Sequence, residues 1–271
     1  LSRNGFSQVT AVFAESMDVY FARTQITERL SAAKEKLPVG AEPKMGAVSA
    51  GLGEIFMWTT HYEHPRGKGA EAKDGKPGWQ SDGSYLTPEG LVLKQDFEFA
   101  MYLRTVQDWI IRPQLKGVPG VAEIDTIGGY EQQFQVQPDP QKLLSLGLTF
   151  SDIITALERN NTSVGAGYIE RKGESYVVRA DGRVQSAEDI GNIIIANEAG
   201  VPVYLKTVAE VGIGRELRTG SASENGNEVV VGTAMMLKGM NSRTVASAVS
   251  EKMQGIVKSL PPDITVTTVL D

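Results

Sequence analysis

Three segments of the chain share one succession: apolar residues at helical spacing, a break rich in proline or glycine, and a strand-like apolar run. Apolar residues that recur about every 3.6 positions predict a helix, and proline or glycine after the last of them predicts its end. The predicted helices cover residues 18–37, 97–110 and 242–257, the breaks lie at 38–40, 117–120 and 260–262, and the predicted strands cover 48–60, 121–127 and 264–269.

Strand-like runs also precede two of these helices, at residues 6–13 and 228–237. Each strand–helix–strand unit has to cover one face of a sheet with its helix, and the crossover is expected to be right-handed. The sequence therefore predicts an α+β fold made of two ferredoxin-like, split βαβ modules.

Two further segments interrupt these modules. Residues 151–225 carry a predicted helix at 150–160, a candidate hairpin around Lys172-Gly173-Glu174, and strand-like runs at 193–196 and 201–205, which predict an inserted mixed α/β subdomain. Residues 65–90 have no hydrophobic period and are rich in turn formers. We expect them to form a long surface loop with little apolar surface to anchor it, and to be the most mobile internal segment.

Composition excludes several function classes. The net charge of -6 gives no electrostatic drive toward phosphate backbones, so no nucleic-acid partner is expected. The chain has no cysteine and two histidines, which leaves no disulfide, no thiolate zinc site and no obvious nucleophilic triad. An enzyme is not expected. The sequence as given holds no run of 18 apolar residues and no signal-peptide pattern.

The two histidines lie three residues apart in His61-Tyr62-Glu63-His64. Imidazole is a common ligand for zinc, copper and nickel, so a shared metal is one interpretation. If residues 48–60 form a strand that continues, His61 and His64 lie on opposite faces, and a shared metal would require the strand to end there. The ordinary interpretation, two surface histidines in a loop, is favoured.

Two carboxylates interrupt apolar strands. Glu54 shares one face of its predicted strand with Leu52, Phe56 and Trp58, while Ile55 and Met57 occupy the other face. Asp125 lies between Ile124 and Ile127. A buried, unpaired carboxylate costs several kcal/mol, so each should be paired, protonated or directed at a polar cavity. A salt bridge or an exposed sheet edge is the ordinary alternative for both.

Several longer stretches resemble one known family, the heavy-metal efflux branch, of the cobalt-zinc-cadmium type, of the resistance-nodulation-division transporters. The resemblance extends over essentially the whole chain and is weakest in residues 65–90. The stretches that carry it are LSRNGFSQVT at 1–10, GLGEIF at 51–56, QDWIIRPQL at 107–115, GVPGVAE at 117–123, GG at 128–129, QPDPQKL at 137–143 and ALERNN at 156–161.

The resemblance implies that the chain is most of the first periplasmic loop of an inner-membrane pump in a Gram-negative bacterium. It divides the chain into a truncated first porter module at 1–60, a mobile insertion at 61–93, a second porter module at 94–150 and 226–271, and a docking subdomain at 151–225. It also implies a homotrimer with a periplasmic adaptor and an outer-membrane channel, driven by protons.

No cofactor is implied, only a transported divalent ion such as zinc, cobalt, cadmium or nickel. By the same resemblance, the strands of Glu54 and Asp125 would line the substrate cleft, which makes these two carboxylates the candidate metal ligands. Two alternatives remain open: a drug-type pump of the same superfamily, whose pocket would be lined by phenylalanine, and a soluble periplasmic metal-binding protein.

Overall fold

The computed structural model describes residues 2–3, 6–14, 16–34, 36–38, 41–171, 174–198, 200–218 and 220–271. The chain divides into two compact units, Leu1–Val48 and Ser49–Asp271. Within the described residues, no helix has both the length and the apolar character needed to cross a membrane.

The first unit holds a short hairpin of β1 (Ser2–Arg3) with β2 (Phe6–Ser7), followed by helix α1 (Val19–Lys34). Asp18 caps the helix by accepting a hydrogen bond from the backbone N–H of Phe21 at 2.9 Å. The predicted strand over residues 6–13 is wrong, because the strand ends at Ser7. Alternating apolar residues form a strand only where another strand pairs with them, and Val9 and Val12 are each 91% exposed.

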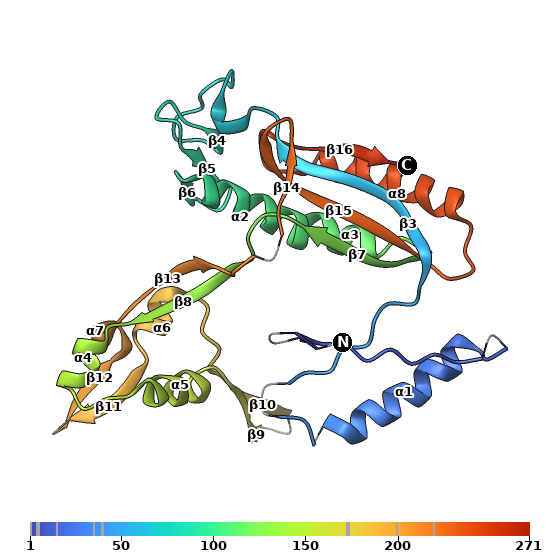
Figure 1. Cartoon of the computed structure of the whole chain (residues 1–271). Coiled ribbons are helices and arrows are strands. Elements are labelled where there is room, and N and C mark those ends of the chain that lie inside the picture. Colours follow the sequence, from blue (N-terminus) through green and yellow to red (C-terminus); the bar gives the residue numbers. More distant parts are fainter. Residues whose placement is uncertain are drawn as a thin grey trace. The chain divides into compact units, whose positions relative to one another are not determined.

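The second unit is built on one antiparallel sheet of five strands, seen in the upper half of Figure 1. The strands are β3 (Ser49–Tyr62), β7 (Val121–Ile127), β14 (Ala222–Glu224), β15 (Asn227–Leu237) and β16 (Ile264–Leu270). β15 pairs with β3 on one side and with β7 and β14 on the other, and β3 also pairs with β16. The spatial order β7-β15-β3-β16 is that of a split βαβ, ferredoxin-like module, which confirms the predicted fold class.

β3 therefore belongs to the same sheet as β15 and β16. The interpretation that placed residues 49–60 with residues 1–48 in one truncated module is wrong at this boundary. Sequence order suggested it, but the register Thr60↔Val230 and Thr60↔Val266 puts β3 between β15 and β16 in the sheet of the second unit.

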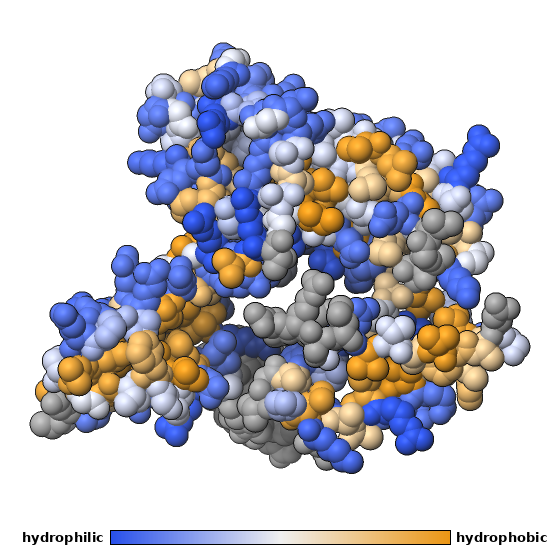
Figure 2. Space-filling model, viewed as in Figure 1, coloured by the Kyte–Doolittle hydropathy of each residue, from blue (hydrophilic) through white to orange (hydrophobic). Residues whose placement is uncertain are grey.

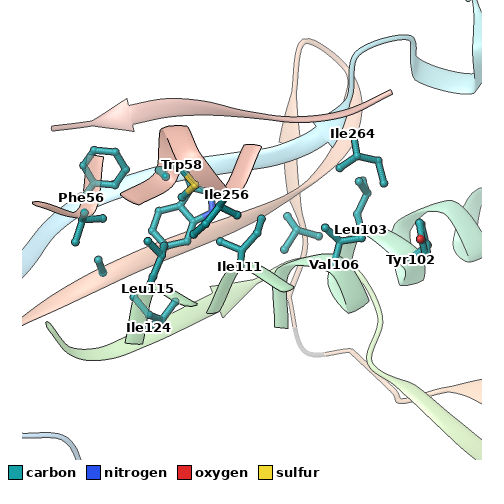
Figure 3. Packing of buried hydrophobic residues seen from close by; sticks show 14 of the residues in the cluster. Phe56, Trp58, Tyr102, Leu103, Val106, Ile111, Leu115, Ile124, Ile256 and Ile264 are labelled. Atoms are coloured by element: carbon teal, nitrogen blue, oxygen red, sulfur yellow. The ribbon is translucent and has the colours of Figure 1, made fainter. Parts of the chain in front are cut away.

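The helices of this module cover the sheet. They are α2 (Asp96–Val106), a π-helical turn (Gln107–Ile111), α3 (Arg112–Lys116) and α8 (Ser242–Val257). Asn241 caps α8 by accepting from the Thr244 N–H at 3.2 Å. Figure 3 shows side chains of the strands and of the helices meeting in one core, with Trp58 and Ile124 among the residues that are 0% exposed.

Two polar side chains, those of Gln107 and Thr60, are fully buried in this core. The Gln107 Oε1 atom accepts hydrogen bonds from Trp58 Nε1 at 2.9 Å and from the Thr60 hydroxyl at 3.1 Å. Both donors belong to β3, so the π-helical turn holds this strand through two buried hydrogen bonds. Gly232 of β15 makes room for the arrangement, because a Cβ atom there would lie 2.2 Å from the Trp58 ring.

Residues 65–93 form a small folded insertion. A one-turn 3₁₀ helix (Pro65–Gly67) leads into a three-stranded sheet of β4 (Gly78–Trp79), β5 (Tyr85–Leu86) and β6 (Val92–Leu93). Trp79 is 3% exposed and Tyr85 0%, and their rings contact Tyr62 of β3 with centroids 5.2 Å away. The expectation of a loop without apolar anchorage is wrong. Trp79 and Tyr85 anchor the insertion, although they belong to no periodic hydrophobic pattern.

The outer face of the insertion, at the top of Figure 2, is largely hydrophilic. Its turn formers and charges are therefore the solvated side of a packed structure. The sequence pattern indicated this exposed side, but it did not predict the buried aromatic side.

The remaining segment has its own core, made mainly of Leu143, Ile153, Ile190, Leu205 and Val208. Its elements are β8 (Gln132–Pro138), α4 (Pro140–Ser145), α5 (Phe150–Arg159), β9 (Ser163–Arg171), β10 (Glu174–Asp181), α6 (Ala187–Gly191), β11 (Ile194–Glu198), β12 (Val201–Tyr204), α7 (Leu205–Val208) and β13 (Ala209–Arg215). β9 and β10 pair as a hairpin, while residues 172–173 of the predicted turn lie outside the described residues.

The boundary predicted at residue 151 is wrong, because β8 pairs with β13 along its whole length and Leu143 belongs to the second core. The subdomain therefore begins near Gln132. The polar sequence of β8, QQFQVQP, gave no sign of where the second core starts.

We expect Trp79→Ala to lower the free energy of unfolding by about 3–5 kcal/mol, because a buried indole and its contacts are removed. Urea denaturation would measure the change. Leu91→Ala is the control, since Leu91 lies in the same insertion with 43% of its surface exposed, and we expect a change within about 0.5 kcal/mol. Equal effects of the two variants would contradict the packed insertion.

Candidate functional site

Glu54 lies on β3 and is exposed, not buried as the apolar pattern predicted. The register explains the difference: Phe56 pairs with Ala234 and Glu54 with Met235, so Ile55 has no partner and forms a bulge. The bulge breaks the alternation, and Ile55 and Phe56 are both buried.

Glu54 lines an open cavity of about 620 Å³. Across from it lie the first turns of α8, with Ser242, Arg243 and Ser247, and the end of the described chain, with Asp271. The lining combines these polar side chains with the apolar Ile55, Ala246 and Leu270. Its charged groups are the Glu54 and Asp271 carboxylates and the Arg243 guanidinium. An ion or a small polar solute suits such a lining better than an aromatic drug does.

Asp125 lies on β7 and is also exposed. It pairs with Thr233 of β15, which pairs in turn with Met57 of β3. β15 therefore separates the strands of Asp125 and Glu54, and their registers differ. The structure does not bring the two predicted carboxylates together into one site.

Glu123, two residues before Asp125 on β7, forms salt bridges. The Glu123 Oε1 atom accepts from Arg112 Nη2 at 3.0 Å and from Lys116 Nζ at 3.1 Å, both on α3. Partial burial would raise the pKa of Glu123, but the hydrogen bonds from Arg112 and Lys116 outweigh it and hold this pKa below its ordinary value.

The two histidines lie in different environments. The Nδ1 atom of His61, on β3, lies 3.4 Å from the Thr59 hydroxyl, which donates to Glu224 at 2.8 Å. β3 ends at Tyr62, and His64 follows in the next turn. There the His64 Nδ1 atom forms a short contact with Asp263 Oδ1. The two rings do not share a ligand group among the described residues.

Asp263 is the residue that the sequence analysis missed. It lies in the turn between α8 and β16 in the left-handed region, with φ 64°, a conformation that aspartate tolerates better than most residues. Its Oδ2 atom accepts from Trp79 Nε1 at 2.6 Å and from the His64 N–H at 3.1 Å. The hydrogen bond to Asp263 raises the pKa of His64 above its ordinary value, against a smaller opposing effect of burial.

The pairing of His64 with Asp263 can be recognised only from the tertiary register. Ile264 of β16 pairs with Tyr62 of β3, which places the turn of residue 263 against residue 64, about 200 positions earlier in the chain. No local pattern links the two segments.

The comparisons with known proteins place the fold and the sequence in one family. A family model described as the AcrB/AcrD/AcrF family matches residues 1–271. The structure is similar to a solved heavy metal efflux pump, with a TM-score of 0.71 and 24% identity over 96% of this chain and 23% of that one.

Three curated relatives match over all 271 residues. They are the nickel-cobalt-cadmium resistance protein NccA of Alcaligenes xylosoxydans xylosoxydans at 55% identity, the nickel and cobalt resistance protein CnrA of Cupriavidus metallidurans at 54%, and the cobalt-zinc-cadmium resistance protein CzcA of the same species at 47%. The match covers 25%, 25% and 23% of these proteins, so this chain spans about a quarter of their length.

We expect Glu123→Gln to lower the free energy of unfolding at neutral pH, and we expect this difference from wild type to disappear in acid. Because the folded-state pKa of Glu123 is lowered, its stabilisation is present above the unfolded value of 4.5 and disappears as pH falls through the folded value. Urea denaturation of wild type and variant between about pH 7 and pH 3 would measure it. A difference that stays constant over this range would contradict the pairing.

Over its whole length the sequence aligns with heavy-metal resistance proteins. Because the family model also matches all 271 residues, the chain belongs to the AcrB/AcrD/AcrF family.

Proposed function

We propose that this chain is the periplasmic porter and docking segment of an inner-membrane pump that exports divalent heavy-metal ions. The observation that carries the proposal is the alignment of all 271 residues, at 47–55% identity, with three proteins whose names specify resistance to nickel, cobalt, cadmium or zinc. The pump would act as a proton-driven homotrimer with a periplasmic adaptor and an outer-membrane channel.

In this proposal the ferredoxin-like module of β3, β7, β15 and β16 is a porter module, and the segment from β8 to β13 is the docking subdomain. The short first unit, residues 1–48, would belong to a neighbouring porter module. These assignments follow the boundaries of the two cores and of the sheet.

Glu54 and Asp125 remain the proposed metal ligands. Both carboxylates are exposed on the sheet, and Glu54 lines the polar cavity beside α8. Because the two lie on separate strands, each would bind an ion together with ligands from outside this chain. Carboxylate oxygens exchange divalent ions readily, which suits a transported ion better than a tightly held one.

Two other functions are less well supported. A drug-type pump would need a pocket lined by aromatic residues, whereas none of the described residues that line the cavity at Glu54 is aromatic, and three of them, Glu54, Arg243 and Asp271, are charged. A soluble metal-binding protein would not be expected to align end to end with a quarter of a larger resistance protein.

We expect Glu54→Gln and Asp125→Asn, introduced into the full-length protein that contains this chain, to lower zinc or cobalt export about tenfold or more, because each change removes a ligand charge at nearly constant volume. Metal resistance of cells and metal flux in proteoliposomes would measure the loss.

Glu251→Gln is the matched control. Glu251 is an exposed carboxylate on α8 of the same module, and it does not line the cavity at Glu54. Expression and oligomeric state should be unchanged in all three variants. Wild-type resistance in both Glu54→Gln and Asp125→Asn would show that neither carboxylate contacts the ion.

A further inference from the structure

A second group of metal-ligand side chains lies at the other end of β3. Glu63, His64 and Asp263 each offer one ligand atom, and these atoms all lie within 4.8 Å of one another. It is the one such group of three or more among the residues that the structure describes. Tyr62 ends β3 eight residues beyond Glu54, which places the group about 25 Å from that carboxylate.

Asp263 holds the His64 ring in one orientation. One carboxylate oxygen contacts His64 Nδ1, and the other is fixed by Trp79 Nε1 at 2.6 Å and by the His64 N–H at 3.1 Å. A histidine that binds a metal commonly donates its other ring nitrogen to a carboxylate in this way, which fixes the tautomer and directs the free nitrogen at the ion.

The remaining ring nitrogen, Nε2, is available. The His64 side chain is 37% exposed, and Nε2 takes part in none of the hydrogen bonds found among the described residues. The ring carbon beside it, Cδ2, faces Gly69 of the insertion, where a Cβ atom would lie 3.7 Å away. Gly69 itself is held at φ 85°, a conformation that favours glycine, and it lies beside the Nε2 edge of the ring.

Glu63 supplies a carboxylate beside the ring, with an oxygen within 4.8 Å of a His64 ring nitrogen. Its side chain is exposed, and its backbone is held by a hydrogen bond from the Glu63 N–H to the Asp263 carbonyl at 2.8 Å. The backbone of the group is therefore fixed at both ends of the turn, while the Glu63 carboxylate is free to move toward an ion.

We propose that Glu63, His64 and Asp263 form a divalent-cation site, in which His64 Nε2 and the Glu63 carboxylate are the protein ligands and Asp263 is the positioning residue. One imidazole and one carboxylate suit zinc, cobalt or nickel, whereas calcium and magnesium take oxygen ligands only. Waters complete the coordination, so the site binds reversibly.

The site is separate from the cavity at Glu54, whose lining includes none of its three residues. An ion bound there connects the end of β3 to the turn before β16, through Asp263, and to the insertion, through Trp79. Occupancy should therefore stabilise the insertion against local opening.

The test is a zinc titration of the untagged 271-residue chain, followed by calorimetry and by the ring nitrogen resonances of its two histidines. We expect one zinc ion to bind and the His64 Nε2 resonance to shift, while the His61 resonances stay in place. The spectrum of His61→Gln, which retains only His64, assigns the signals.

His64→Gln should weaken zinc binding at least about tenfold, and Glu63→Gln should weaken it by a similar factor, while His61→Gln is the matched control and should bind as wild type does. Glu63 is exposed, so its variant tests the site even if His64→Gln fails to fold. Absence of binding up to about 1 mM zinc, or binding lost in His61→Gln and kept in His64→Gln, would overturn the proposal.

Discussion

The position of β3 is the constraint on which the second unit depends. This strand pairs with β15 on one edge and β16 on the other, and Phe56, Trp58 and Thr60 bury their side chains at 0% exposure. Gln107 accepts hydrogen bonds from Trp58 and Thr60, so the helical layer also fixes the strand. A buried donor without a partner costs about 1–3 kcal/mol, which penalises any shift in register.

Both candidate metal groups take their places from this strand. Near its start, the bulge at Ile55 turns Glu54 out toward the cavity beside α8. Past its end, the turn after Tyr62 brings His64 against Asp263, and Tyr62 contacts the aromatic anchor of the insertion. One strand thus positions two separate groups of candidate metal ligands, Glu54 near its start and the Glu63–His64–Asp263 group just past its end.

Hydrophobic periodicity correctly predicted the helices and strands that bury one continuous face. The predicted strand at 121–127 and the helix at 242–257 have the observed limits, because apolar spacing and the flanking breaks coincide there. Predictions failed where a tertiary event overrides spacing: the bulge that exposes Glu54, the aperiodic Trp79 and Tyr85 that anchor the insertion, and the polar β8 that opens the second core. The pairing of His64 with Asp263 could not be predicted, since it depends on the register of β3 with β16.

The central claim is that β3 presents Glu54 to a transported divalent ion. Anomalous diffraction at the zinc edge, on crystals of the full-length protein grown with zinc, tests it most directly. We expect a peak about 2.0–2.2 Å from a Glu54 carboxylate oxygen, the ordinary length of a zinc–oxygen bond. A fully occupied zinc site elsewhere in the cleft, with no peak at Glu54 over the same range of zinc concentration, would contradict the account.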